Sequence, residues 1–346
     1  KIIIHNLLFI IAECAQGYLM PCKNESVELA KMLVRSAKSA GADAVKFQLI
    51  VADELSTEDY KYFELFKKLE IGYEGFKKVC DLANEINIEV IFDVFGPKSL
   101  SIAESLNIKT IKIHPTDFTN FQLLEMVEKS KKIEHIIAGC GGAFLKEINS
   151  TLKKLGNNKK ITLLHGFQGY PTPLEDNCLD RIRHLTKIAS NSSGEVLVGF
   201  ADHCDPDNDD ATQIASLAIG FGARVLEKHL TLARCLKLED SESALSPDEM
   251  KEFIKIIRGV SNSFIDREST SDDFHLPNSE LKYRESFARH VVSTKYLSKG
   301  HLVTTADICM KRSSSASPIL SKEQVLGKTL STAINKNKPI EKTNLL

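Results

Sequence analysis

The sequence contains Val-Leu-Val-Gly-Phe-Ala-Asp-His (196–203) and Arg-Val-Leu-Glu-Lys-His (224–229), two apolar runs that each end in a histidine. Their length and composition are typical of buried strands. Between them, residues 209–222 have helical spacing, with acidic residues at the start and a glycine at the end. The stretch predicts a β-α-β unit, in which neighbouring strand ends allow His203 and His229 to share one metal ion.

The same unit repeats from the start of the chain. Eight apolar runs predict strands, at Leu8–Ala12, Ala44–Gln48, Val90–Val94, Thr110–Ile113, His135–Ala138, Ile161–His165, Val196–Ala201 and Arg224–His229. Amphipathic segments predict helices after them, among them Ser26–Ala40, Phe76–Glu85, Pro97–Leu106, Phe121–Ser130, Leu174–Ala189 and, after a longer loop, Pro247–Val260. Eight alternating units favour an α/β fold, the (β/α)₈ TIM barrel, whose active site lies at the carboxyl ends of the strands. A doubly wound open sheet is the alternative, because a sequence does not reveal whether a sheet closes.

The composition is that of a cytoplasmic enzyme. The chain is 42% hydrophobic and 26% charged, with a formal net charge of −1. Such a balance leaves ample material for a core and shows no bias toward nucleic acid or membrane. The apolar opening Lys1–Ala12 is the one candidate targeting segment, but His5 and Asn6 interrupt it and it lacks a small-residue cleavage site. We interpret it as a strand at the bottom of the barrel that leads into the first barrel strand.

The cysteines are expected to be reduced thiols. Eight of them lie scattered along the chain without Cys-x-x-Cys pairs, at positions 14, 22, 80, 140, 178, 204, 235 and 309. Cys204 follows His203 directly, but adjacent residues of a strand point to opposite faces. We therefore do not count Cys204 as a metal ligand.

The character of the chain changes after Val260. Residues 261–279 are polar, lack periodicity and include a proline, which is typical of a linker. The remainder has short β-type runs at His290–Ser293, His301–Thr304 and Lys328–Ala333. The predicted organisation is a catalytic barrel over residues 1–262, a linker over 263–283 and a small β-rich domain over 284–346. That last domain is too short for a large core, so we expect it to dock on another surface.

Several motifs occur in order at successive strand ends, and together they resemble the sialic acid synthase family. They are Phe-Ile-Ile-Ala-Glu (9–13), Ala-Gly-Ala-Asp-Ala-Val-Lys-Phe-Gln (40–48), Leu-Leu-His (163–165), Tyr-Pro-Thr-Pro-Leu-Glu-Asp (170–176), Gly-Phe-Ala-Asp-His (199–203), Glu-Lys-His-Leu-Thr-Leu (227–232) and Ser-Pro-Asp-Glu (246–249). The Lys-Arg pair at 311–312, after a Thr-x-x-Asp-Ile turn (304–308), resembles the antifreeze-like (SAF) domain of that family.

The resemblance implies condensation of phosphoenolpyruvate with an open-chain N-acetylated amino-sugar aldehyde, such as N-acetylmannosamine. The products are a nonulosonic (sialic-type) acid and phosphate. A divalent ion, Mn²⁺ or Mg²⁺ in this family, would be held by His203 and His229 and would polarise the aldehyde as a Lewis acid. Lys46 and Lys112 match the lysines that bind the anionic phosphoenolpyruvate.

The resemblance also implies roles for further residues. Glu13, Tyr170 and Asp240 match residues at the sugar site, and Gln168 replaces an asparagine that binds phosphoenolpyruvate. Asp117 matches a glutamate that handles water or a proton at carbon 2, and Glu227 lies near the metal; a buried ion pair between Glu227 and a lysine is the structural alternative. Arg312 matches an arginine that reaches from the SAF domain into the barrel of the partner subunit, which implies a domain-swapped homodimer.

The chain departs from the family where Ser or Thr hydroxyls usually face phosphoenolpyruvate. It has Val94, Pro115, Ala138 and Ala201 at those positions, and charge-assisted hydrogen bonds of about 1.5–3 kcal/mol each are lost with the hydroxyls. Gly-Cys-Gly-Gly (139–142) offers compensation, because its backbone amides can face a phosphate; a tight strand-to-helix turn is the alternative. Cys-Ala-Gln-Gly-Tyr (14–18) replaces the usual Gly-x-Asn-His beside the sugar site, which predicts an uncommon acceptor.

Two other functions remain open at this point. A barrel with lysines at strand ends is also typical of a Schiff-base aldolase that uses Lys46, Lys112 or Lys228 and needs no metal. The lost hydroxyls are compatible with a chain that binds a sugar or a partner enzyme without catalysis. Metal-dependent consumption of phosphoenolpyruvate separates both alternatives from the synthase.

Overall fold

The computed structural model describes residues 8–167, 169–264, 275–315 and 317–346. The chain divides into two compact units, residues 1–265 and 266–346. Predictions that fall on residues 1–7, including the strand at the bottom of the barrel, lie outside the described residues. No helix in the described part is long and apolar enough to cross a membrane.

The first unit is a closed barrel of eight parallel strands, each paired with its neighbours in sequence order. All eight predicted strands are present, and closure excludes the open sheet. The strands are β1 (Phe9–Ala15), β2 (Ala44–Gln48), β3 (Glu89–Val94), β4 (Thr110–Ile113), β5 (His135–Gly139), β6 (Lys160–His165), β7 (Val196–Asp202) and β8 (Val225–His229). β1 pairs with both β2 and β8, which closes the barrel.

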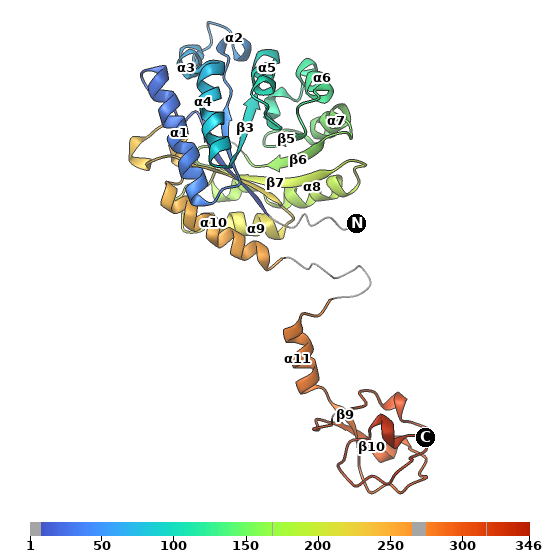
Figure 1. The fold of residues 1–346 in the computed structure, drawn as a ribbon. Helices are drawn as coiled ribbons and strands as arrows, with labels where there is room; N and C mark the ends of the chain where they lie inside the picture. The colour runs from blue at the N-terminus through green and yellow to red at the C-terminus, as the bar shows by residue number, and fades with distance from the viewer. Residues whose placement is uncertain (1–7, 168, 265–274, 316) are drawn as a thin grey trace. The chain divides into compact units, whose positions relative to one another are not determined.

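Helices surround the strands (Figure 1). They are α1 (Lys23–Ala40), α4 (Gly72–Glu85), α5 (Pro97–Ser105), α6 (Phe121–Lys129), α7 (Leu145–Leu155), α8 (Asp180–Ser190), α9 (Ala211–Gly220) and α10 (Pro247–Asn262), with two short additional helices, α2 (Ala52–Leu55) and α3 (Phe63–Leu69), before α4. Apolar residues at helical spacing turn one face of each long helix toward the barrel.

The predicted helix over Leu174–Ala189 is wrong in one respect, because the segment is broken. A 3₁₀ turn, η2 (Leu174–Asn177), precedes α8, and Cys178 between them has a left-handed φ of 44°. The side-chain amide of Asn177 donates to the carbonyl oxygens of Pro173 and Leu174, which closes the turn. Local hydrogen bonds of an Asn therefore compete here with helix continuation.

Strand residues alternate between two hydrophobic layers. One set fills the barrel interior: Ile11, Ala44, Ile91, Ile137, Leu164, Ala201 and Val225. The other set packs against the helices and includes Phe47, Phe92, Val94 and Ala138. Because side chains alternate with a period of two, the residue two positions after each interior residue also faces inward, closer to the carboxyl end of the strand.

The second unit contains α11 (Asn278–Phe287) and an antiparallel pair of strands, β9 (His290–Ser293) and β10 (Ile308–Lys311). Its core includes Val291, Leu297, Val303, Ile308, Ile319, Val325, Leu330, Ile334 and Ile340. The predicted run at His290–Ser293 is a strand, whereas His301–Thr304 and Lys328–Ala333 form only isolated bridges, including Leu302 with Thr329. β10 was not predicted.

α11 covers part of the segment that we predicted as linker, residues 263–283. None of its residues is buried. A helix without a buried face carries no apolar periodicity, which is why the sequence pattern did not indicate it.

Candidate active site

Charged side chains form a second layer inside the barrel, directly above the apolar interior layer. Four of these charged residues lie two positions after an apolar residue of the interior layer: Glu13, Lys46, Asp93 and Glu227. Lys112 on β4 is paired in register with Asp93 on β3, and Lys46 with Glu13 on β1. At most 3% of each of these side chains is exposed. The two predicted lysines are therefore buried in the barrel rather than solvated at its rim.

Four ion pairs connect the charged layer. The Lys46 ammonium contacts the carboxylates of Glu13 and Asp93, the latter at 2.7 Å, and lies 3.8 Å from Glu227. The Lys112 ammonium lies 2.6 Å from the other oxygen of Glu227. Glu227 thus forms the buried ion pair with a lysine that was the structural alternative to a role near the metal. Its partner Lys112 is one of the two lysines predicted to bind phosphoenolpyruvate.

The ion pairs set the charge states. Burial by itself lowers the pKa of Lys46, but the carboxylates of Asp93, Glu13 and Glu227 together raise it well above its usual value. Burial by itself raises the pKa of Asp93 and of Glu227, yet the two ammonium groups hold both below their usual range. Burial raises the pKa of Glu13 to about 7, so this carboxyl carries a proton part of the time near neutral pH.

His203 and His229 lie beside the charged layer, as the sequence predicted from their neighbouring strand ends. Their ring centroids are 5.2 Å apart. Burial lowers the pKa of His203 to about 3 and that of His229 well below its usual value, so both imidazoles are neutral at physiological pH. Nδ1 of His203 is buried and has no hydrogen-bond partner among the described residues.

Neutral imidazoles with a buried free nitrogen are suitable ligands for a divalent metal. The two histidines therefore fit the metal pair that the sequence predicted. Within the described ranges, no group of three or more His, Cys, Asp or Glu residues is arranged to hold a metal ion. Cys204 turns away from the pair, because its sulfur lies within hydrogen-bonding distance of the side chain of Asn177.

Tyr170 covers the histidines. Its ring meets His203 edge-on at 5.2 Å and His229 at 5.5 Å between centroids. Asp240 has a left-handed φ of 62°, and burial, followed by the charges of Glu239 and Glu242, raises its pKa to about 6. Burial, followed by the charge of Asp240, raises the pKa of Tyr170 well above its usual range.

Asp117 lies in a 3₁₀ turn, η1 (Pro115–Asp117), directly after β4. The side-chain amide of Asn120 donates to its Oδ1 at 3.3 Å. Burial raises the pKa of Asp117, which favours a carboxyl able to exchange protons.

For two predicted residues the structure gives no position relative to this cluster. Gln168 lies outside the described residues. Arg312 belongs to the second unit, where it is exposed; its Nε donates to the carbonyl oxygen of Phe287, and its guanidinium lies 5.0 Å from the centre of the Phe287 ring. Each unit is described by itself, so the structure does not relate Arg312 to the barrel.

The structure changes the interpretation of the lost hydroxyls. Val94 and Ala138 belong to the hydrophobic layer under the helices, so neither side chain faces the barrel interior. On β3 the inward residue at this level is Asp93, which the sequence analysis missed. Its position two residues after Ile91 was the available signal, because an acidic residue at an inward position of a barrel strand needs a buried partner.

Gly-Cys-Gly-Gly (139–142) has a packing role. The Cys140 amide donates to the carbonyl oxygen of Leu164 at 2.7 Å. A Cβ on Gly141 would collide with the backbone carbonyl of Gly166, so a side chain is excluded there. α7 begins only at Leu145, with Phe144 as its N-cap. The motif therefore does not lead directly into a helix start, and these features favour the tight-turn interpretation.

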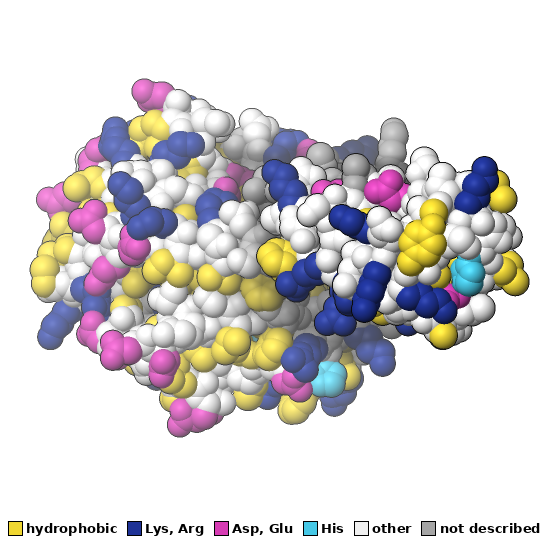
Figure 2. All heavy atoms as spheres, turned by 90° about the horizontal axis from the view of Figure 1, so that it is seen from below, with side chains coloured by type: hydrophobic (Ala, Val, Ile, Leu, Met, Phe, Trp, Pro, Cys, Tyr) yellow, Lys and Arg dark blue, Asp and Glu magenta, His cyan; other side chains and the backbone are white. Residues whose placement is uncertain are grey.

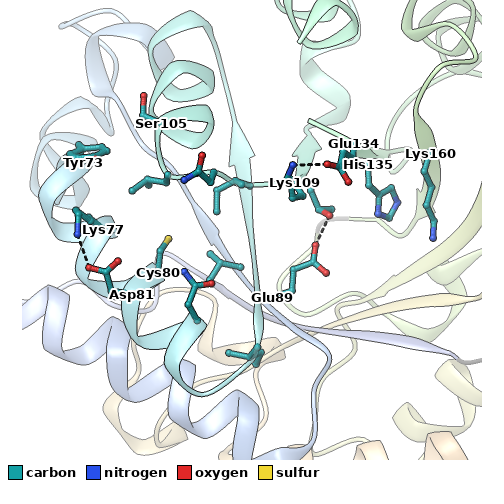
Figure 3. A pocket seen from close by; sticks show the side chains of 17 residues that line it. Tyr73, Lys77, Cys80, Asp81, Glu89, Ser105, Lys109, Glu134, His135 and Lys160 are labelled. Carbon is teal, nitrogen blue, oxygen red and sulfur yellow. Dashed lines mark hydrogen bonds and ion pairs between the residues drawn. The ribbon is translucent and has the colours of Figure 1, made fainter. Parts of the chain in front are cut away.

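A cavity of about 700 Å³ lies at the opposite end of the barrel strands. Figure 3 shows side chains from the starts of β3 to β6 around it, including Glu89, Lys109, Glu134, His135 and Lys160. Several of the charged groups pair with one another, such as Lys109 with Glu134 at 2.5 Å. Because active sites of TIM barrels lie at the carboxyl ends of the strands, we assign the candidate active site to the charged layer and the histidines.

Comparison with known proteins places most of the chain in one family. Residues 33–268 match the model of the NeuB family. The chain is 32% identical to an uncharacterized protein of Methanocaldococcus jannaschii, over 88% of this chain and 84% of that protein. It is 30% identical to an N,N'-diacetyllegionaminic acid synthase of Legionella pneumophila, over 88% and 85% of the two chains.

A solved structure has the same architecture. The N-acetylneuraminic acid (sialic acid) synthetase of Leptospira borgpetersenii superimposes with a TM-score of 0.69 at 25% identity, over 82% of this chain and 93% of that one. The resemblance of the barrel motifs to the sialic acid synthase family is thereby confirmed. The chain belongs to the NeuB family of sialic acid synthase-like enzymes.

Proposed function

We propose that the barrel condenses phosphoenolpyruvate with an N-acetylated amino-sugar aldehyde to give a nonulosonic acid and phosphate. The names of the relatives support this reaction class, because they are synthases of diacetyllegionaminic and sialic acids. One structural observation carries the proposal: two buried ammonium groups and two neutral imidazoles share one end of a closed barrel.

The lysines provide the site for the anionic substrate. Phosphoenolpyruvate carries a phosphate and a carboxylate, and a buried site for it requires cations. Lys46 and Lys112 are cations at the level of the strand ends, and both lie in the same ion-paired cluster around Glu227. Gln168 is the further proposed contact.

His203 and His229 are the residues that would hold Mn²⁺ or Mg²⁺. The free buried Nδ1 of His203 supports this assignment. When bound, the ion supplies Lewis-acid polarisation of the sugar aldehyde. Tyr170 packs against both rings and restricts the orientations available to them.

Carbon–carbon bond formation joins C3 of phosphoenolpyruvate to the aldehyde carbon, and the aldehyde oxygen takes up a proton. Glu13, with a pKa of about 7, is suited to exchange that proton near neutral pH. Water then adds at C2 and loses one proton. When the bond from C2 to the phosphate oxygen breaks, the remaining hydroxyl proton leaves with the phosphate and C2 becomes a ketone. Asp117, whose pKa burial raises, is the proposed group that orients the water and accepts its proton.

Tyr170 and Asp240 are the proposed contacts of the sugar, together with Arg312 from a partner subunit. We further propose that residues 284–346 form an SAF domain that docks on the barrel of a second copy in a domain-swapped homodimer. Charge supports this docking: residues 275–346 contain twelve Lys and Arg and five Asp and Glu, a net +7, whereas residues 8–264 contain 31 and 37, a net −6. Figure 2 shows Lys and Arg side chains, in dark blue, on the protein surface.

The Schiff-base alternative is disfavoured by the state of the lysines. A lysine nucleophile needs a lowered pKa, but that of Lys46 is raised by its carboxylate partners even though burial opposes this. Lys228 lies next to Glu227 on β8 and therefore points to the opposite face, where its ammonium contacts Asp202 at 3.2 Å and the carbonyl oxygen of Cys204.

Phosphate release from phosphoenolpyruvate tests the proposal. The assay uses Mn²⁺ and a panel of N-acetylated hexosamine acceptors, with chelator and no-acceptor controls. We expect release that depends on an acceptor and stops with chelator. Release without acceptor, or turnover that persists in chelator together with a borohydride-trapped lysine adduct, would contradict the synthase assignment.

A further inference from the structure

Asp93 is one of the acidic residues of the charged layer. It lies on β3 between Lys46 and Lys112, in register with Gln48 on one side and Lys112 on the other. Only 2% of the residue is exposed. Asp93 is therefore a buried carboxylate at the level where the two proposed anion-binding lysines project.

Its two oxygens have different surroundings. Oδ2 accepts a hydrogen bond from the Lys46 ammonium at 2.7 Å. Oδ1 is buried and accepts no hydrogen bond from any residue that the structure describes. A buried carboxylate oxygen without a donor is costly, so the free Oδ1 calls for a reason other than stability alone.

The balance of charge in the layer gives a reason for a buried carboxylate at position 93. Lys46 and Lys112 carry two positive charges, and Asp93 and Glu227 carry two negative charges. Glu13 adds further negative charge whenever it is ionised. The layer without substrate is therefore neutral or negative, so a phosphoenolpyruvate anion must compete with Asp93 for the Lys46 ammonium.

We propose that Asp93 is a positioning residue that fixes the Lys46 ammonium in the absence of substrate and sets a weak affinity of the site for phosphoenolpyruvate. This inference rests on the proposed function. Asp93 acts through Lys46, since its carboxylate orients the ammonium before the anion arrives. A weaker hold on anions also lets the phosphate product leave.

The test is Asp93→Asn, which removes the charge and leaves an oxygen acceptor for Lys46. Titration calorimetry measures the Kd of phosphoenolpyruvate and, separately, of inorganic phosphate. We expect both anions to bind more tightly, on the order of tenfold, because one nearby negative charge is gone. In the turnover assay KM for phosphoenolpyruvate falls, and kcat falls as well, because a neutral amide holds the ammonium less firmly.

A matched control is Asp202→Asn. Asp202 forms a buried ion pair with Lys228 on the face that packs against the helices, away from the charged layer. It reports the cost of neutralising a buried aspartate, and we expect no gain in affinity for either anion. Asp93→Glu restores the charge and should bring affinity back toward the weak wild-type value. If Asp93→Asn does not fold, Asp93→Ser carries the same test.

The outcomes distinguish a failure of the role proposed for Asp93 from a failure of the proposed substrate. Unchanged or weaker binding of both anions by folded Asp93→Asn or Asp93→Ser overturns the role of Asp93. If the wild type binds phosphate but not phosphoenolpyruvate, while Asp93→Asn still tightens phosphate binding, the proposed substrate is wrong and the role of Asp93 in anion affinity stands.

Discussion

Lys46→Met tests whether the charged layer depends on its central cation. The substitution keeps an unbranched side chain of similar length but leaves Glu13, Asp93 and Glu227 buried, with Lys112 as the one remaining ammonium of the layer. Lys46 is 0% exposed, so solvent does not replace the lost partner. Breaking a buried ion pair typically costs about 3–5 kcal/mol, and we expect a loss of that size in the free energy of unfolding.

Part of this cost is relieved by proton uptake. Without Lys46 the carboxylates lose a favourable partner, so their pKa values in the folded state rise. A raised carboxyl pKa gives stability that is present at low pH and is lost as pH rises through the folded value. The loss in Lys46→Met should therefore be larger at pH 8 than at pH 6, because the pKa of Glu13 is already about 7 in the wild type.

A double-mutant cycle with Asp93→Asn measures the coupling. Urea unfolding of the wild type, both single variants and the double variant gives four free energies at each pH. We expect the double variant to be more stable than the sum of the single losses predicts. The reason is that Asp93→Asn removes one of the negative charges that Lys46→Met leaves without a partner. A loss below about 1 kcal/mol in Lys46→Met, or strict additivity in the cycle, would refute the structural argument.

Three further predictions concern the metal pair, the proposed base and a partly buried histidine. His203→Ala or His229→Ala should abolish both Mn²⁺ binding in equilibrium dialysis and turnover, with the circular dichroism spectrum unchanged; a folded variant that is fully active in chelator would contradict the metal assignment. Asp117→Asn should lower kcat by about 10²–10⁴ in the phosphate-release assay with little change in KM, as expected for a lost acid–base group. Partial burial lowers the pKa of His135 from 6.5 to about 4, so the free energy of unfolding should fall as pH drops below 6.5, by about 2 kcal/mol at pH 5. Urea unfolding of His135→Gln should lack this slope, and an equal slope in both proteins would count against a neutral imidazole at this position.

The architecture of the first unit was readable from the sequence. The strands and most of the helices were predicted because the apolar patterns of a barrel are local and strong, as in residues 196–203 and 224–229. The break at Cys178 was not predicted, because it depends on side-chain hydrogen bonds of Asn177. The helix α11 was not predicted, because it has no buried face. The order of motifs along the strand ends also sufficed to identify the family.

The sequence by itself determined which residue types stand at the strand ends: two histidines, two lysines and several acids. Only the tertiary structure decided which of them meet, because strand pairing and barrel closure bring together residues as distant as Lys112 and Glu227. The inward position of Asp93 and the outward position of Val94 follow from the register of β3 within the closed barrel. A shift of one residue exchanges the two faces of a strand, so the side chains that line the site were fixed only by the fold.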